Sequence, residues 1–74
     1  MKKYSKLTNT IRGAVKREGF SYKEFSQLIG MPEQTLLYRF RNPGTWRFYE
    51  WGAVLRHIPF KQEELQDIER ELRK

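Results

Sequence analysis

Glycine and proline residues punctuate this 74-residue chain so often that only short elements fit between them. The main breaks stand at Gly19, Gly30, Asn42-Pro43-Gly44 and Pro59. Glycine commonly ends a helix, and proline cannot continue one because it lacks a backbone N–H. Between the breaks, apolar residues recur at helical spacing, and no stretch alternates convincingly with the period of two that marks a strand. We therefore expect an all-α fold, a compact five-helix bundle that forms a single domain over residues 1–74.

The second helix has the clearest local signals. Ser21 and Glu24 have the spacing of a capping box, in which each side chain accepts a hydrogen bond from the other residue's backbone N–H. Phe20 and Phe25 stand at the two positions of a hydrophobic staple, which fixes the angle at which the chain enters the helix. Gly30 ends this helix, and Pro32 suits the first position of the next one. The pair of helices is expected over about 21–41, with the second of them over about 32–41.

The other three helices are predicted from their apolar faces, over about 6–18, 48–58 and 61–73. Arg47 stands just before the fourth helix, where a Ser or Thr cap is usual, and Thr45 is the alternative cap if that helix begins earlier. The last helix either folds back on the domain or forms the seam of a dimer. The residues expected to face inward are Leu7, Ile11, Ala14, Val15, Phe25, Leu28, Ile29, Leu36, Phe40, Phe48, Trp51, Val54 or Leu55, Ile58, and Leu65, Ile68 and Leu72 of the last helix.

Charge is distributed unevenly along the chain, whose net charge is +6. Residues 1–60 carry eleven basic and four acidic side chains, whereas residues 61–74 carry four basic and five acidic ones. The excess of positive charge in residues 1–60 suits a surface that binds a polyanion. The last helix, in which positive and negative charges nearly cancel, is expected to have a different role.

Composition excludes several functional classes. The chain has no cysteine and a single histidine, His57, so disulfides, thiolate zinc sites and histidine-pair metal sites are excluded. We expect His57 to be a packed or partly solvated residue without a chemical role. No nucleophile–base pair or metal constellation is present, and no run of 18 apolar residues occurs. We expect a soluble, cytoplasmic binding domain that is not an enzyme, needs no cofactor or metal and does not enter a membrane.

The two helices on either side of Gly30 have the layout of a helix-turn-helix. The run from Gly19 to Leu36, GFSYKEFSQLIGMPEQTL, resembles the phage repressor and Cro family of regulators, whose fold is lambda-repressor-like. The continuation from Tyr38 to Trp46, YRFRNPGTW, is similar to a variant found in small prophage-type regulators. The resemblance covers roughly residues 7–60 and implies a five-helix bundle that binds double-stranded DNA, usually as a dimer.

The resemblance also implies which residues contact DNA. Glu33, Gln34 and Tyr38 face the bases, although Glu33 is equally explained by stabilising the positive end of its helix. Tyr38 contacts either a thymine methyl or a phosphate. The residues expected at phosphates or the groove edge are Tyr22, Thr35, Arg41 and Arg47, with long-range attraction from Arg39 and from Lys2, Lys3 and Lys6.

Aromatic residues crowd the segment before and within the fourth helix. Trp46 and Tyr49 do not share the face of Phe48 and Trp51, so they are candidates for a protein interface. Gly52 in this helix is explained by close helix approach across a dimer or by simple tolerance. Leu65, Ile68 and Leu72 are the other candidate interface residues.

The main prediction is a sequence-specific, double-stranded DNA-binding transcription regulator of phage or mobile-element origin, acting as a homodimer on a palindromic site. The first alternative is a protein-interaction module on the same fold, such as an antirepressor that binds a repressor. The second is a non-specific nucleic-acid binder, whose affinity depends steeply on salt and little on sequence.

Overall fold

The computed structural model describes residues 4–72 as an all-helical structure. Within that range the elements, in order, are α1 (Lys6–Arg17), α2 (Tyr22–Leu28), α3 (Glu33–Arg41), the 3-10 turn η1 (Pro43–Thr45), α4 (Phe48–His57) and α5 (Gln62–Leu72). The predicted all-α fold with five helices is therefore confirmed, and each predicted break falls between two α-helices, with the break at Asn42-Pro43-Gly44 leading into and forming part of η1. Arg73, the expected end of the last helix, lies outside the described residues.

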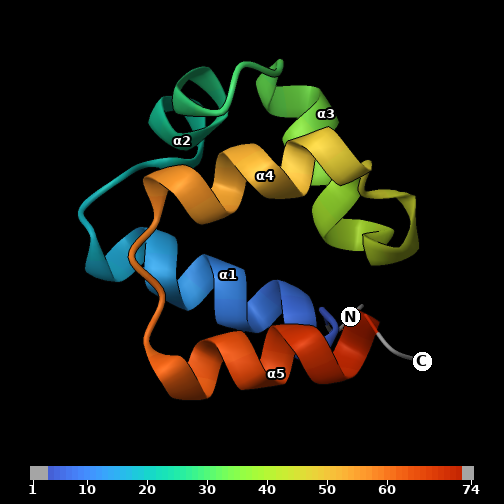
Figure 1. The fold of residues 1–74 in the computed structure, drawn as a ribbon. Coiled ribbons are helices and arrows are strands. Elements are labelled where there is room, and N and C mark those ends of the chain that lie inside the picture. The colour runs from blue at the N-terminus through green and yellow to red at the C-terminus, as the bar shows by residue number, and fades with distance from the viewer. Residues whose placement is uncertain (1–3, 73–74) are drawn as a thin grey trace.

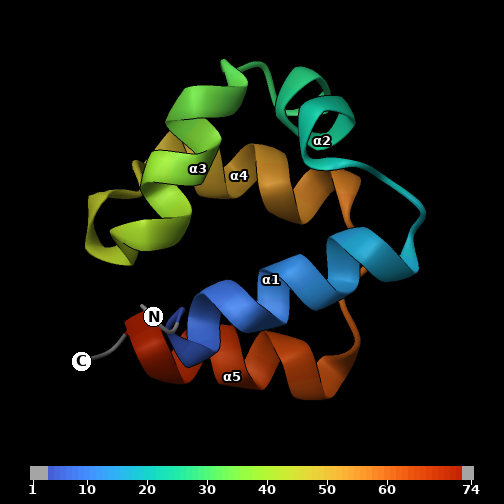
Figure 2. The same ribbon diagram turned by 180° about the vertical axis from the view of Figure 1, so that it is seen from behind.

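The helices are stacked in a molecule of 27 × 27 × 25 Å. Figures 1 and 2 show α1 and α5 side by side at one end, the α2–α3 pair at the other, and α4 between them. Arg17 fastens α1 to the start of α5, because it donates to Glu64 at 2.7 Å and to the carbonyl of Pro59 at 3.2 Å. The hydrogen bond from Arg17 holds the pKa of the Glu64 carboxyl below its usual range. No helix of residues 4–72 is both long and apolar enough to cross a bilayer.

One core receives side chains from all five helices. Thr8 is buried within it, and its hydroxyl donates to the backbone carbonyl of Phe40 at 2.7 Å, which joins α1 to the end of α3. Such a bond satisfies a carbonyl that α3 itself leaves without a helical partner. The buried apolar residues are Leu7, Ile11, Ala14, Val15, Phe25, Leu36, Phe40, Trp46, Val54, Ile58 and Ile68.

The structure corrects the predicted inner face of α4. Phe48 is 84% exposed, whereas Glu50, Val54 and Ile58 are buried. Trp51, as expected, packs against the core, although it is only partly buried. Each residue turns an α-helix by about 100°, so Phe48 and Glu50 lie on opposite sides of it. Of the two alternatives at the middle of this face, Val54 is buried and Leu55 is exposed.

Smaller corrections apply to α2 and α5. Leu28 and Ile29 were expected in the core and are only half-buried, since they lie at the end of α2. In α5, Ile68 is buried against the rest of the domain and Leu65 is exposed, so this helix folds back. Leu72 belongs to α5, but its side chain lies outside the described residues.

Candidate nucleic-acid interface

Helix α2 begins and ends with two complete capping motifs. The Ser21 hydroxyl accepts from the backbone N–H of Glu24 at 3.1 Å, and the Glu24 carboxylate accepts from that of Ser21 at 2.9 Å, as predicted. The bond from the Ser21 backbone holds the pKa of Glu24 below its usual range. At the other end, Gly30 has φ +77°, a conformation that side chains disfavour, and the N–H of Met31 bonds to the carbonyl of Ser26 at 2.9 Å. This Schellman motif fixes where α3 begins.

The start of α3 differs by one residue from the prediction. Pro32 has an extended backbone, with φ −62° and ψ 147°, so it precedes the helix and Glu33 is the first helical residue. Pro32 makes no side-chain capping bond, although its carbonyl accepts from Leu36 at 3.1 Å. Helix α3 therefore starts from a stiff residue with a fixed φ and carries a carboxylate in its first turn.

The predicted base-facing residues share one exposed side of α3. Glu33, Gln34 and Tyr38 are all exposed, and their positions lie within an arc of about 140°. Arg41 falls within the same arc, two turns beyond Glu33. Leu37 also falls within this arc, half-buried and packed against the core, while Leu36 and Phe40 beyond its edge are fully buried and fix the backbone of α3.

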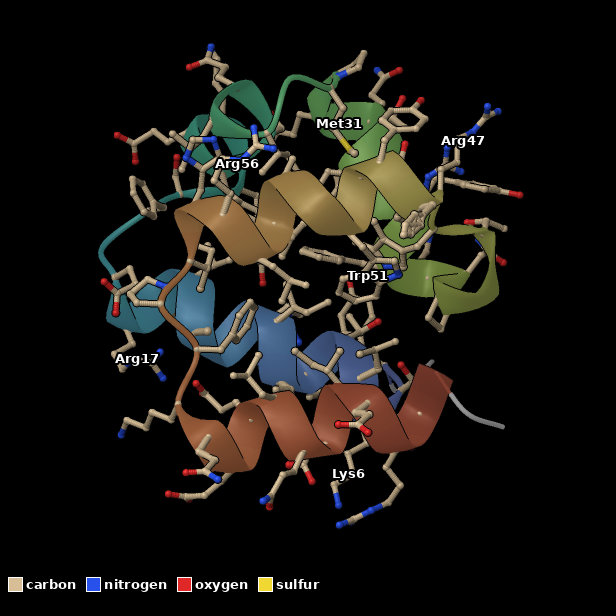
Figure 3. The ribbon with its side chains drawn as sticks, in the orientation of Figure 1. Lys6, Arg17, Met31, Arg47, Trp51 and Arg56 are labelled. Carbon is tan, nitrogen blue, oxygen red and sulfur yellow. The ribbon has the colours of Figure 1, made fainter. Side chains whose placement is uncertain are left out.

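Thr35 lies on a different side of α3 from the polar face. It is half-buried and lines a cavity of about 320 Å³ between the Gly30 turn and the start of α4. Met31 points toward α4 at this cavity, and Arg47 points away from the body of the molecule (Figure 3). Of the expected phosphate contacts, Arg41 and Arg47 are thus exposed, and Thr35 is recessed.

A nearly buried ion pair closes the other side of this cavity. Arg39 donates to both carboxylate oxygens of Glu50, at 3.0 and 3.3 Å, and the two side chains are only 12% and 6% exposed. The backbone N–H of Arg47 also donates to Glu50, at 2.8 Å. Glu50 therefore holds α3 to α4 and caps α4. The expectation that Arg39 supplies long-range attraction is corrected, since its charge is paired inside the molecule.

Tyr22 belongs to a basic cluster that sequence reasoning missed. Its ring packs edge-on against Phe40 at 5.3 Å between centroids, and its hydroxyl accepts from the Arg12 guanidinium. Arg12 also stacks on the ring of Tyr4 at 4.4 Å. Arg12 and Tyr22, together with Lys16 one turn further along α1, line a cavity of about 200 Å³. The available signal was the four-residue spacing of Arg12 and Lys16, which places both on one face of α1.

The candidate interface residues divide into buried and exposed ones. Trp46 is buried, because the η1 turn folds it against Phe40 and Trp51, at centroid distances of 6.5 and 5.0 Å. Ile68 is also a core residue, so neither is an available surface. Tyr49 is 71% and Leu65 43% exposed, and Leu72 lies outside the described side chains.

His57 is exposed at the end of α4. Within residues 4–72, no three His, Asp or Glu side chains gather as metal ligands do. The exposed surface therefore offers polar and basic groups on α1 and α3, Arg47, and the apolar side chains of Phe48, Tyr49 and Leu55 on α4.

The chain was compared with family models, with curated proteins and with solved structures. None of the three comparisons gave a match. The residues of the chain itself therefore carry the functional inference.

Proposed function

We propose that the protein is a sequence-specific regulator that binds double-stranded DNA, with α2 and α3 as a helix-turn-helix of the repressor and Cro type. The observation that carries the proposal is that Glu33, Gln34, Tyr38 and Arg41 are exposed together on α3, while Leu36 and Phe40 hold this helix against the core. A short helix with one polar and one fixed apolar side fits the major groove of DNA, which admits a helix and presents a distinct pattern for each base pair.

Gln34 is the proposed reader of a base. It stands at the second position of α3, and the first turn of a recognition helix is the part that reaches base edges. Its amide pairs with the N6 and N7 positions of adenine, which discriminates against other bases by about 1–3 kcal/mol. Glu33 beside it accepts from cytosine N4 or stabilises the helix end, and Tyr38 contacts a thymine methyl or a phosphate.

Phosphate binding is assigned to two groups of cations. Arg12 and Lys16 of α1, with the Tyr22 hydroxyl, form the first group; the bond from Arg12 to Tyr22 fixes these two side chains, and Lys16 lines the same cavity. Arg47 at the start of α4 is the second. Lys6 is exposed, but its ammonium group lies 3.7 Å from a carboxylate oxygen of Asp67, so its charge is partly paired. Lys2 and Lys3, the other lysines expected to attract DNA, lie outside the described residues. Neutralising phosphates supplies affinity, and the α3 face supplies specificity.

The proposed target is a palindromic site bound by two copies of the chain. The test is a binding selection from a pool of flanking DNA against scrambled DNA, at about 50 and 200 mM salt. We expect a preference of about 10³-fold or more for one fragment, retained at the higher salt. Equal binding to both pools would contradict the proposal and support non-specific attraction.

Two variants locate the readout. Gln34→Ala should weaken binding to the selected fragment by about 5- to 150-fold, which corresponds to about 1–3 kcal/mol, and should leave binding to scrambled DNA unchanged. Gln62→Ala is the matched control, since Gln62 is also an exposed glutamine but opens α5 at the other end of the molecule. Equal losses in both variants would refute the assignment to α3.

A protein-interaction module is the second candidate. The observation that favours it is the pair of exposed aromatic residues at the start of α4, Phe48 and Tyr49. Large exposed apolar groups mark protein interfaces. If this candidate holds, Gln34→Ala leaves the activity intact and substitution of Phe48 abolishes it.

A further inference from the structure

Helix α4 has an apolar outer face that no part of residues 4–72 covers. In Figure 1 α4 runs across the front of the molecule, with the other helices above, below and behind it, and Figure 2 shows the reverse arrangement. Phe48 is 84% exposed, Tyr49 71% and Leu55 47%. Phe48, Gly52 and Leu55 follow one another at helical spacing, and Tyr49 and Arg56 form the neighbouring row, so these five residues define the α4 outer face.

The glycine in the middle of this face has no explanation within the chain. A methyl group added at Gly52 would meet no atom within 4 Å, and its φ is not positive. Glycine inside a helix costs about 0.8–1 kcal/mol relative to alanine. A helix that approaches α4 from outside would make use of the missing side chain, since small residues let two helix backbones come close.

We infer that the α4 outer face is the contact surface for a second copy of this chain, with the two α4 helices antiparallel and crossing at Gly52. Phe48 stands about 6 Å before Gly52 along the helix axis, and Leu55 about 4.5 Å after it. A two-fold axis at Gly52 therefore brings Phe48 and Tyr49 of one copy against the partner's Leu55 and the partner's Arg56. Every such contact occurs twice, as an isologous interface requires.

The charges of this face agree with an antiparallel partner. The two Arg56 side chains would lie at opposite ends of the contact, about 12 Å apart, which exceeds the screening length of about 8 Å at physiological salt. Each Arg56 meets the aromatic end of the other helix, where ring and guanidinium attract each other. The carboxylate of Glu50 faces Arg39 inside the molecule, so no acidic group of this helix remains at the contact. The antiparallel orientation also pairs the positive end of one helix with the negative end of the other.

The size of the surface predicts the strength of association. The exposed parts of Phe48, Tyr49 and Leu55 offer roughly 400 Å² per copy, because each aromatic side chain contributes about 150–250 Å² when fully exposed. Two copies would bury roughly 800 Å² through these groups, which is below the 1,200 Å² or so of stable complexes. The contact is therefore a weak, concentration-dependent dimer, and it does not depend on the proposed DNA binding.

Sedimentation equilibrium without DNA tests this inference, over about 1 to 500 μM protein, the range in which weak dimers form. We expect the wild-type chain to pass from monomer to dimer, and Phe48→Ala to weaken the association at least tenfold. Leu55→Ala should weaken it less, and Leu65→Ala is its matched control, since Leu65 is an equally exposed leucine on α5. A wild-type chain that stays monomeric throughout, or a dimer lost in Leu65→Ala and kept in Phe48→Ala, would overturn the inference.

Two substitutions at Gly52 test whether the two α4 helices cross at this residue. Gly52→Ala should raise the melting temperature of the monomer, because alanine favours the helix, and at the same time weaken the dimer. In Gly52→Cys the two thiols of a dimer would meet at the axis, and added oxidised glutathione would convert them to a disulfide while it is reduced to two glutathione thiols; the disulfide requires Cα atoms closer than about 7 Å. The natural chain has no cysteine, so any cross-link reports this one position. Gln62→Cys is the control, and equal cross-linking of the two variants would refute the crossing at Gly52.

Discussion

Helices α2 and α4 are capped by a glutamate at the same helical position, and the two caps differ in what else they hold. Glu24 bonds back to Ser21, three residues away, and both residues are exposed. Glu50 bonds back to the backbone of Arg47 and also receives both donors of Arg39 from α3, in a nearly buried position. The cap of α2 is a local device, whereas the cap of α4 is shared with the helix proposed to read DNA.

This difference separates local from long-range control of the fold. Loss of the Glu24 cap frays one short helix. Loss of Glu50 uncaps α4, leaves the buried Arg39 without a partner and frees α3 from α4. The same residue type at equivalent positions therefore serves one helix in one case and the geometry of the whole candidate site in the other.

The largest effect is expected from Glu50→Ala. Removing one partner of a buried ion pair costs about 3–5 kcal/mol, because the other charge remains buried and unpaired. A domain of this size has a total stability of about 5–15 kcal/mol, so the variant should be strongly destabilised in urea denaturation. The double variant Arg39→Met with Glu50→Leu removes both charges and should recover most of the loss. A single variant that loses under about 1 kcal/mol would show that the pair is not important for stability.

Ser21→Ala is expected to have a smaller and purely local effect. Loss of a serine cap costs about 1 kcal/mol, and glycine at the same position costs only a few tenths. Urea denaturation of Ser21→Ala and Ser21→Gly measures the free energy of unfolding of each variant. If Ser21→Ala cost as much as Glu50→Ala, the cap of α2 would not be local, and the comparison would fail.

Acid should weaken the α2 cap through Glu24. Its pKa is lower in the fold than in the unfolded chain, because the backbone N–H of Ser21 donates to it. The ionised cap thus stabilises the fold fully above the ordinary glutamate pKa of about 4.3, and this contribution disappears as the pH falls through the lowered value. Melting temperatures between about pH 5 and pH 3 should fall less steeply in Glu24→Gln than in the wild type. Parallel curves would contradict this role, since the pKa of Glu64 is also lowered and acts in both proteins.

The smallest effect is expected where α3 has no side-chain cap. Pro32→Ser adds a hydroxyl cap, which stabilises, and frees the backbone of the unfolded chain, which destabilises. These opposed contributions should leave the free energy of unfolding within about 1 kcal/mol of the wild type. A larger loss would show that the fixed φ of Pro32, more than any cap, sets the start of α3.

The parts of the fold that could be predicted from the sequence have their causes within a few residues. The capping box and Gly30 lie between residues 21 and 30, so the bounds of α2 follow from local chemistry. The inner face of α4 could not be predicted in this way. A glutamate in a sequence is normally expected to be exposed. Glu50 is buried because it pairs with Arg39, eleven residues earlier in the chain, and Phe48 lies on the opposite side of α4.

The candidate site shows the same division. The exposure of Glu33, Gln34 and Tyr38 follows from the helical period once Leu36 and Phe40 face the core. The bond between Arg12 and Tyr22 and the burial of Trp46 depend on how separate helices meet, which no local pattern contains. Their roles toward DNA remain predictions.

The hydrogen bond from Thr8 to Phe40 also bears on the order in which the molecule folds. The final turn of α3 obtains a partner for its carbonyl from a residue 32 positions earlier in the chain, on α1. A nascent α3 therefore has an incomplete end until α1 docks, and isolated helices of nine residues are marginal in water. The proposed reading helix and the layer formed by α1 and α5 should consequently form and melt as one cooperative unit. Warming that loosens the α1 end would then disable the proposed DNA recognition at the opposite end of the molecule.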